Sequence, residues 1–318
     1  MGNQAGREDG VTFSYDVKSE LALLKIERKI EALIELSTMA GLNASVSLQG
    51  GDLSLRFFSE HPDVILRVTE LVKKLYKLKP EVYERSDSNL QIKPIYRTGL
   101  SGQALEMFLE ESGYDIMGKA KAPVADILSR LNPEKNAKAY LRGAFLASGS
   151  VVDPEKSYHL EIILKNSQQC RCLEHVAKVL GLEFKKTMRN DDQVYYIKDS
   201  ENISNFLIDV GAGKAMLELE NIRISKEVSN DINRQVNAET ANFDKQIKAS
   251  AVQIQHIDKI ASKVGLDKLP ESLRQVAYAR LKNPEASLKE LGEKMSPKLG
   301  KSGVNHRLKR IKEISDKL

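Results

Sequence analysis

Tryptophan is absent from this chain, and aromatic residues make up only 6% of it. Proteins that bind single-stranded nucleic acids stack the bases on aromatic side chains, so this composition gives that class little support. No apolar run approaches the roughly 18–20 residues that a helix needs to cross a bilayer. The opening residues, MGNQAGREDGVTF, are polar and glycine-rich, unlike a signal peptide. We expect a cytoplasmic protein that has no membrane partner.

Cysteine is also scarce, and the two that occur, Cys170 and Cys172, lie two positions apart in a stretch with helical periodicity. On a helix their side chains point about 200° apart, which suits neither a mutual disulfide nor a shared metal ion. We therefore expect apolar packing for both.

Two further kinds of chemistry find no support. The segment VGAGKAM (210–216) partly matches a phosphate-binding loop, but Ile208 and Ala215 stand where that motif needs glycine and serine or threonine. No arrangement typical of nucleophilic catalysis stands out either. We expect no enzymatic activity of that kind, no metal and no cofactor.

An internal repeat organises the first two thirds of the chain. The order helix, hairpin, helix, two strands, helix occurs over residues 31–113 and returns from residue 138. Ser45 and Ser150 lie 105 positions apart, and Tyr96 and Tyr196 lie 100 apart. Solenoid units run ~20–50 residues, so a repeat this long indicates a pseudo-two-fold domain. The predicted limits are a flexible tail at 1–11 and a domain at 12–222, with repeats at about 12–125 and 136–222.

Each half opens with a helix that is rich in small residues, LSTMAGLNA (36–44) in the first and LRGAFLASG (141–149) in the second. Small residues spaced four apart let two helix backbones approach to the short end of the usual ~8–10 Å range. We predict that these two helices pack on each other along the pseudo-two-fold axis.

Two αββαββα halves with small-residue helices at their seam resemble the LAGLIDADG homing endonuclease fold. In that family, the acidic residue before the last glycine of each helix motif holds a divalent metal at the scissile phosphate. The matching positions here are Asn43 and Ser148, and neither is an acid. The resemblance thus implies the fold without the nuclease activity. Asp52 and Asp153 fall in hairpin turns, where aspartate is common for local reasons.

The C-terminal end has a different charge and pattern. Residues 268–318 contain thirteen Lys/Arg and six Asp/Glu, a net charge of +7, whereas the remaining 267 residues carry −2. Such asymmetry indicates an acidic partner, of which nucleic acid is the obvious example. Residues 223–265 are polar and helix-compatible, and we interpret them as a helical linker. Residues 266–318 then predict a compact all-α module of three helices.

The last two helices of this module predict a helix-turn-helix. Ser287 and Glu290 form a capping-box pattern at the start of the second helix. In the third, Val304, Leu308 and Ile311 recur at helical spacing and should face the core. A basic outer face with polar residues in its first turn is typical of a recognition helix in the major groove. The candidate DNA-binding residues are Ser287, Lys298, Lys301, Ser302, Asn305, His306, Arg307, Lys309, Arg310 and Lys312.

Four stretches in this order resemble the WhiA family of transcriptional regulators: FSYDVKSEL (13–21), YLRGAFLASGSVVDPEKSYHLEI (140–162), NRQVNAETAN (233–242) and ASLKELGEKMSPKLGKSGVNHRLKRI (286–311). The resemblance implies an α+β, pseudo-two-fold LAGLIDADG-like domain without nuclease activity, followed by an all-α helix-turn-helix. It also implies a nucleoid-associated regulator that binds promoter double-stranded DNA and is linked to sporulation or cell division. In actinobacteria it implies a WhiB-type iron–sulfur partner.

Two alternatives stay open. A metal-dependent DNA endonuclease would need acids that are missing at positions 43 and 148. A protein-interaction scaffold would use the repeat domain to hold a partner, while a basic C-terminal helical bundle binds protein or attaches to DNA without sequence preference.

Overall fold

A computed structural model describes residues 12–49, 51–85, 94–114 and 133–318. The predicted tail at 1–11 lies outside these residues, as does the predicted end of the first repeat at 115–125. The chain divides into two compact units, Met1–Ser225 and Lys226–Leu318, which are described separately below.

The first repeat of unit 1 follows a short helix, α1 (Phe13–Ala22). Its four strands form an antiparallel sheet in the order β1-β2-β4-β3. One face of this sheet is buried, with Leu55 and Phe57 pointing into the core. The elements in chain order are α2 (Lys29–Asn43), β1 (Ala44–Gln49), β2 (Asp52–Ser59), α3 (Pro62–Tyr76), β3 (Tyr83–Arg85), β4 (Ile95–Ser101) and α4 (Gly102–Ser112).

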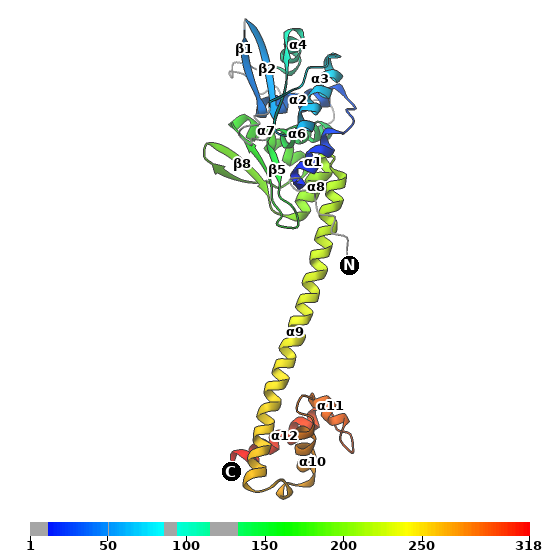
Figure 1. Cartoon of the computed structure of the whole chain (residues 1–318), viewed down its shortest axis with the longest axis vertical. Coiled ribbons are helices and arrows are strands. Elements are labelled where there is room, and N and C mark those ends of the chain that lie inside the picture. The colour runs from blue at the N-terminus through cyan, green and yellow to red at the C-terminus, as the bar shows by residue number, and fades with distance from the viewer. Residues whose placement is uncertain (1–11, 50, 86–93, 115–132) are drawn as a thin grey trace. The chain divides into compact units, whose positions relative to one another are not determined.

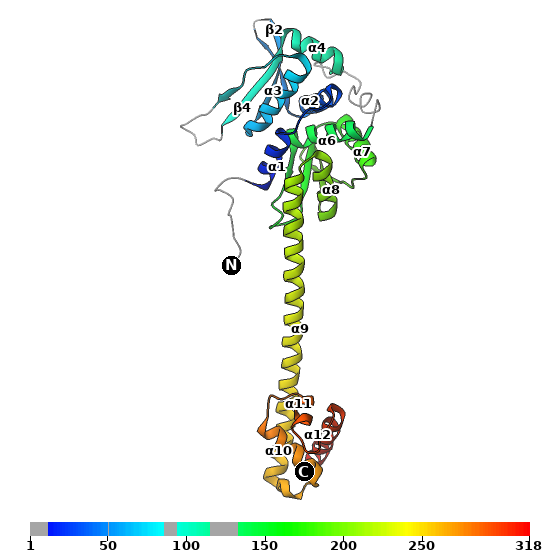
Figure 2. The same cartoon turned by 90° about the vertical axis from the view of Figure 1, so that its right-hand side faces the viewer.

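The second repeat has the same order of elements, and its sheet has the equivalent strand order, β5-β6-β8-β7. The predicted αββαββα repeat is therefore confirmed. Helices cover one face of each sheet, with α2 and α6 central among them (Figures 1 and 2). The elements are α6 (Pro133–Ser148), β5 (Gly149–Val151), β6 (Leu160–Leu164), α7 (Ser167–Leu180), β7 (Lys185–Arg189), β8 (Asp192–Ile197) and α8 (Ser200–Val210).

Strand register shows which residues of the two repeats correspond. Ala44 pairs with Phe57, and Gly149 pairs with Ile162, so the offset of 105 holds for the first hairpin. Phe57 then pairs with Thr98, whereas Ile162 pairs with Tyr195, because the second repeat is shorter between these strands.

The match of Tyr96 with Tyr196 that the sequence suggested is wrong. Tyr196 pairs with Glu161 in the second sheet, and Gly99 pairs with Arg56 in the first. Because Arg56 and Glu161 are themselves 105 positions apart, Tyr196 occupies the place of Gly99.

The helices α2 and α6 pack against each other more extensively than any other two elements. Gly143 lies at their crossing: a Cβ atom on it would lie 2.7 Å from the carbonyl oxygen of Glu35 and 3.1 Å from the Cβ of Thr38. The hydroxyl of Thr38 donates to the carbonyl of Ile34 within α2 at 2.8 Å, so this polar side chain is paired at the crossing. The predicted close packing of the two small-residue helices is confirmed.

A buried ionic network lies beside this crossing. The Glu35 carboxylate accepts two hydrogen bonds from Arg67 of α3, from Nε at 2.7 Å and from Nη2 at 2.9 Å. It also accepts one from Arg142 of α6 at 3.3 Å. Arg142 in turn donates to the carbonyl of Val210 at 2.8 Å. One carboxylate of the first repeat therefore links helices of both repeats, and its desolvation is offset by two cationic partners.

Both cysteines lie buried on α7 and form no disulfide. Burial raises the pKa of the Cys172 thiol, which keeps it neutral. The expected apolar packing is confirmed.

Unit 2 is helical. The helix α9 (Gly213–Lys263) begins in unit 1 and ends in unit 2, where η1 (Leu266–Lys268), α10 (Glu271–Lys282), α11 (Leu288–Glu293) and α12 (Lys301–Asp316) follow. The three helices expected in the C-terminal module are present. Position 222 lies within α9 and position 265 lies just after it. The predicted domain boundaries at these two positions stay predictions.

We expect Gly143→Ala to lower the free energy of unfolding of unit 1 by about 1–3 kcal/mol, because the new methyl group overlaps the backbone of α2. Gly213→Ala is the matched control, since nothing lies within 4 Å of a Cβ at that helical position. Thermal unfolding followed by circular dichroism measures both. Equal midpoints for the two variants would contradict the close crossing.

Candidate nucleic-acid interface

One side of α12 packs against the other helices of unit 2, and this leaves the opposite side facing solvent. Val304, Leu308 and Ile311 are buried, as their spacing predicted. They belong to one apolar cluster with residues from α10, α11 and the end of α9. The members from those helices are Ile257, Ile260, Leu273, Val276, Ala277 and Leu291. Burial of one stripe leaves the opposite side of α12 toward solvent.

Helix α11 begins with the predicted capping box. The Ser287 hydroxyl accepts a hydrogen bond from the Glu290 amide at 3.2 Å, and the Glu290 carboxylate accepts one from the Ser287 amide at 2.7 Å. These bonds hold the pKa of Glu290 below its ordinary value. Ser287 therefore lies at the start of α11, apart from the other candidate residues, and its oxygen already serves as a cap.

A buried arginine positions the loop that leads into α11. The guanidinium of Arg280 donates to the carbonyls of Asn283 (3.4 Å), Pro284 (3.3 Å) and Ala286 (2.6 Å). Burial lowers its pKa. From α9, Gln246 Nε2 donates to the carbonyl of Glu285 at 2.7 Å.

Arg280 is absent from the residues predicted above, although the sequence holds a signal for it. Arg280 stands seven positions after Leu273 on the same stripe as Val276 and Ala277. A charged residue at the core-facing position of an amphipathic helix indicates an anchoring role.

Gly292 holds α11 against the turn that precedes α12. Its carbonyl accepts a hydrogen bond from the Leu299 amide at 3.0 Å. A Cβ on Gly292 would lie 2.0 Å from the carbonyl oxygen of Leu299, so only glycine permits this approach. The sequence contained no local sign of this contact.

The candidate residues of α12 divide by their contacts. Helical spacing puts Ser302, Asn305, His306 and Lys309 on one side of α12, where all but the half-buried Asn305 are exposed. Arg307 is turned toward α10 instead, and its Nη1 donates to the carbonyl of Ser272 at 3.3 Å.

The remaining basic candidates surround that side. Arg310 is exposed and forms an ion pair with Glu313 at 3.0 Å. Lys298 in the turn, Lys301 at the helix start and Lys312 further along are also exposed. The structure thus groups polar side chains in the first two turns of α12 with basic side chains around them.

The positions that would hold metal in an endonuclease are the last residues of α2 and α6. Asn43 Nδ2 donates to the carbonyl of Phe58 at 2.5 Å, and the Ser148 hydroxyl donates to the carbonyl of Ala144 at 3.3 Å. Neither side chain carries charge. Within the described residues, no group of three or more His, Cys, Asp or Glu is placed to hold a metal ion.

None of the helices in the described part of the chain is long and apolar enough to span a membrane.

Three domain families match the chain. The WhiA N-terminal LAGLIDADG-like domain matches residues 29–113, the WhiA LAGLIDADG-like domain matches 137–229, and the WhiA C-terminal HTH domain matches 232–315. Together these families cover most of the sequence, and they agree with the predicted fold class.

Relatives that match over nearly their whole length agree with these domain matches. A probable cell division protein WhiA from Desulfitobacterium hafniense (strain Y51) is 37% identical, with 97% of this chain and 96% of the relative covered. Another from Thermoanaerobacter sp. (strain X514) is 40% identical, with 97% and 98% covered. The crystal structure of full-length DUF199/WhiA from Thermatoga maritima superposes with a TM-score of 0.59 at 27% identity, covering 97% of this chain and 99% of that one.

We expect Gly292→Ala to destabilise unit 2 by about 2–3 kcal/mol, because the added Cβ overlaps the backbone of Leu299. Gly303→Ala is the matched control: its Cβ would meet only the Leu299 side chain at an ordinary 3.7 Å, and alanine favours the helix. Chemical denaturation of the full chain, followed by helix content, compares the two variants. If both unfold at the same denaturant concentration, the tight contact at Gly292 is wrong.

Proposed function

This chain belongs to the WhiA family, and we propose that it is a sequence-specific, DNA-binding transcriptional regulator that reads double-stranded DNA through α12. The observation that carries the proposal is the division of α12 into a buried apolar stripe and an exposed polar and basic side. The net charge of +7 over residues 268–318 supports it, because a duplex backbone attracts such a surface.

The exposed side chains suit two separate tasks. Lysine and arginine neutralise phosphates and supply most of the affinity, which is independent of sequence. We assign this task to Lys298, Lys301, Lys309, Arg310 and Lys312. Asparagine pairs with adenine, and hydroxyl or imidazole groups contact base edges, so we assign base reading to Ser302, Asn305 and His306.

Arg307 and Ser287 differ from the other candidates, because their polar groups already form hydrogen bonds within the protein. Arg307 already donates to the Ser272 carbonyl, so part of its guanidinium is engaged in holding α12 to α10. Ser287 uses its oxygen as a helix cap. Its hydroxyl proton stays available to a phosphate near the start of α11.

We propose that the repeat domain does not cut DNA. A catalytic Mg²⁺ requires carboxylate oxygens, and Asn43 and Ser148 offer an amide and a hydroxyl that are hydrogen-bonded to backbone carbonyls. These residues do not fit the metal that the fold family uses.

The relatives are named as probable cell division proteins, which supports a link to cell division for this chain. Sporulation, nucleoid association and a WhiB-type iron–sulfur partner stay predictions. The protein-scaffold alternative, in which the repeat domain holds a partner, differs from our proposal in what it expects of α12: it requires no preference of α12 for any DNA sequence.

Substitutions on α12 test the proposal. A duplex enriched from fragmented genomic DNA and a scrambled duplex of the same length are labelled, and binding is followed by fluorescence anisotropy. With four to six phosphate contacts, log affinity should fall with log salt at a slope of about −4 to −5. Lys309→Ala should weaken binding to both duplexes and make the slope of log affinity against log salt shallower by about 0.9. Asn305→Ala should cost about 1–3 kcal/mol on the enriched duplex only.

Lys268→Ala is the matched control, because Lys268 is exposed in the same unit and lies outside α12. If Asn305→Ala leaves the difference in affinity between the two duplexes unchanged, the result favours the scaffold alternative. If the affinity does not change with salt concentration, the proposed phosphate contacts are wrong.

Incubation with supercoiled plasmid and Mg²⁺ tests the absence of nuclease activity. We expect the plasmid to remain supercoiled, because no carboxylate stands at positions 43 and 148. A Mg²⁺-dependent nick made by the full chain, and absent from a preparation of the Ser148→Ala and Asn43→Ala double variant, would establish the endonuclease alternative instead.

A further inference from the structure

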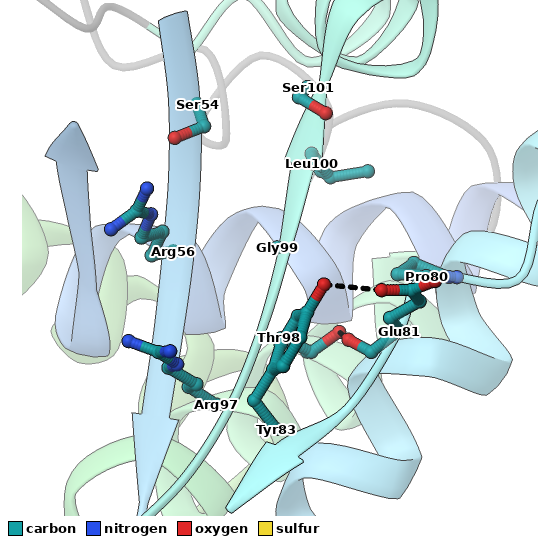
Figure 3. Close-up of a pocket in the computed structure, with 10 residues that line it drawn as sticks. All are labelled: Ser54, Arg56, Pro80, Glu81, Tyr83, Arg97, Thr98, Gly99, Leu100 and Ser101. Carbon is teal, nitrogen blue, oxygen red and sulfur yellow. Dashed lines mark hydrogen bonds between the residues drawn. The ribbon is translucent and has the colours of Figure 1, made fainter. Parts of the chain in front are cut away.

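Two surfaces of the molecule are not used by the function proposed above. The first is a hollow of about 650 Å³ on the solvent-facing side of the first sheet, which Arg56 and Arg97 border (Figure 3). Through the strand register, Glu161 and Tyr196 of the second sheet stand in the places of Arg56 and Gly99. The two sheets therefore differ at this place. The surface that points to a binding partner lies elsewhere, on α9.

This second surface is an apolar stripe on the part of α9 that belongs to unit 2. Val228, Ile232, Val236 and Phe243 are spaced by four, four and seven residues, which puts them on one side of the helix. Each of these side chains is 53–54% exposed. Ile257 continues the same side of α9 and is buried in the apolar cluster of unit 2. One face of α9 is therefore packed near its end and exposed before it.

The stripe has the shape of a helix-pairing surface. Exposed apolar residues that occur singly are normal, but a continuous group of them marks an interaction site. A helix also gains most of its stability from the packing of its apolar face. From Val228 to Phe243 the stripe is about 22 Å long, at 1.5 Å per residue. A partner helix of this length with an apolar side of its own fits it, and a second copy of the chain supplies one.

One charged residue in the stripe restricts how two copies pair. Glu239 is exposed and lies three residues after Val236 and four before Phe243, so it shares their side of α9. In a parallel pair each residue lies opposite its own equivalent, and the two Glu239 carboxylates would repel each other. In an antiparallel pair that places Ile232 opposite Phe243 of the other copy, Glu239 lies opposite Val236. The stripe therefore favours the antiparallel arrangement.

The charges that border the stripe match the same register. Helical spacing puts Glu227, Asp231 and Lys245 on one border, and all three are exposed. In the antiparallel pair this border meets its equivalent, and Lys245 comes level with the stretch between Glu227 and Asp231 of the other copy. Asp231 also pairs with Arg234 along its own helix at 3.7 Å, but both side chains are mostly exposed and such a pair is weak. Opposite charges therefore meet at both ends of the stripe.

The end of the stripe near the C-terminal helices has space for the other copy. A hollow of about 640 Å³ borders Phe243, and the loop of residues 283–287 forms another of its walls. Gln246 Nε2 holds this loop to α9 by donating to the carbonyl of Glu285 at 2.7 Å. In the register given above, Val228 of the second copy comes level with Ile247, beside this hollow. An apolar side chain of the second copy therefore has space to enter there.

We propose that two copies of this chain associate through residues 228–243 of α9 as an antiparallel helix pair, with Ile232 of one copy opposite Phe243 of the other. Four apolar side chains from each copy then leave water, which is the main favourable contribution. The contact is small beside a standard interface, so we expect a dissociation constant of about 1–100 µM. The inference uses neither α12 nor DNA, so it holds or fails independently of the proposed function.

Sedimentation of the full chain without DNA tests the association. Between about 1 and 300 µM, the weight-average mass should rise from 35.6 kDa toward twice that value. Ile232→Gln with Phe243→Gln removes the central apolar contact, and the dissociation constant should rise about tenfold or more. Val252→Gln is the matched control, because Val252 is 49% exposed on the opposite side of α9, and it should change the constant by less than about twofold. Circular dichroism checks helix content, and Phe243→Ala alone is the milder variant.

Disulfide cross-linking tests the orientation. A chain carrying Ile232→Cys is mixed with one carrying Phe243→Cys under oxidising conditions, while the native cysteines stay buried. The antiparallel register predicts a disulfide between the two different chains. Neither chain should cross-link with itself, because its equivalent positions lie about 16 Å apart along the pair.

Two kinds of result would overturn the proposal. If the wild type keeps a mass of 35.6 kDa at every concentration, or if the stripe variant and the Val252→Gln control associate equally, a second copy does not cover the stripe. If each cysteine variant cross-links with itself and not with the other, the helices are parallel and the proposed register is wrong.

Discussion

The close crossing of α2 and α6 is the constraint on which the rest of the repeat domain depends. Gly143 lets the backbone of α6 reach the Glu35 carbonyl, and the Glu35 carboxylate then binds Arg67 and Arg142 from both repeats. A buried carboxylate needs such partners, because an unpaired charge in the core costs several kcal/mol. The crossing therefore sets the relation between the two repeats, and each sheet takes its place from the helix that precedes it.

The two repeats share this frame and differ at their surfaces. Both small-residue helices end in an uncharged side chain bonded to a backbone carbonyl, at Asn43 and Ser148. The solvent-facing side of the first sheet keeps a hollow between Arg56 and Arg97, whereas Glu161 and Tyr196 occupy the equivalent place in the second. A fold that is held by its helices tolerates such divergence, because the outer sheet faces make no contact with the core.

In the C-terminal unit, a different set of contacts holds α11 and α12 in a fixed relation. Its apolar cluster is modest, so polar contacts that end in backbone groups supplement it: Arg280 on three loop carbonyls, the capping box of α11 and the Gly292 carbonyl on Leu299. Buried polar groups of this kind specify one geometry, since any other arrangement leaves them unpaired. The base reading that we propose for α12 requires a precise arrangement of α11 and α12.

Much of this protein was readable from its residues alone. The helices, the hairpins, the repeat, the capping box at Ser287 and the core stripe of α12 all arise from neighbours within a few positions, where periodicity and short-range hydrogen bonding decide the outcome. Only the tertiary structure decided that Tyr196 takes the place of Gly99, that Glu35 binds Arg67 and Arg142, that Gly292 touches Leu299, and that Arg56 and Arg97 border one hollow. Those contacts join elements that lie far apart in the sequence, and the strand register and side-chain partners that set them leave no periodic trace in it.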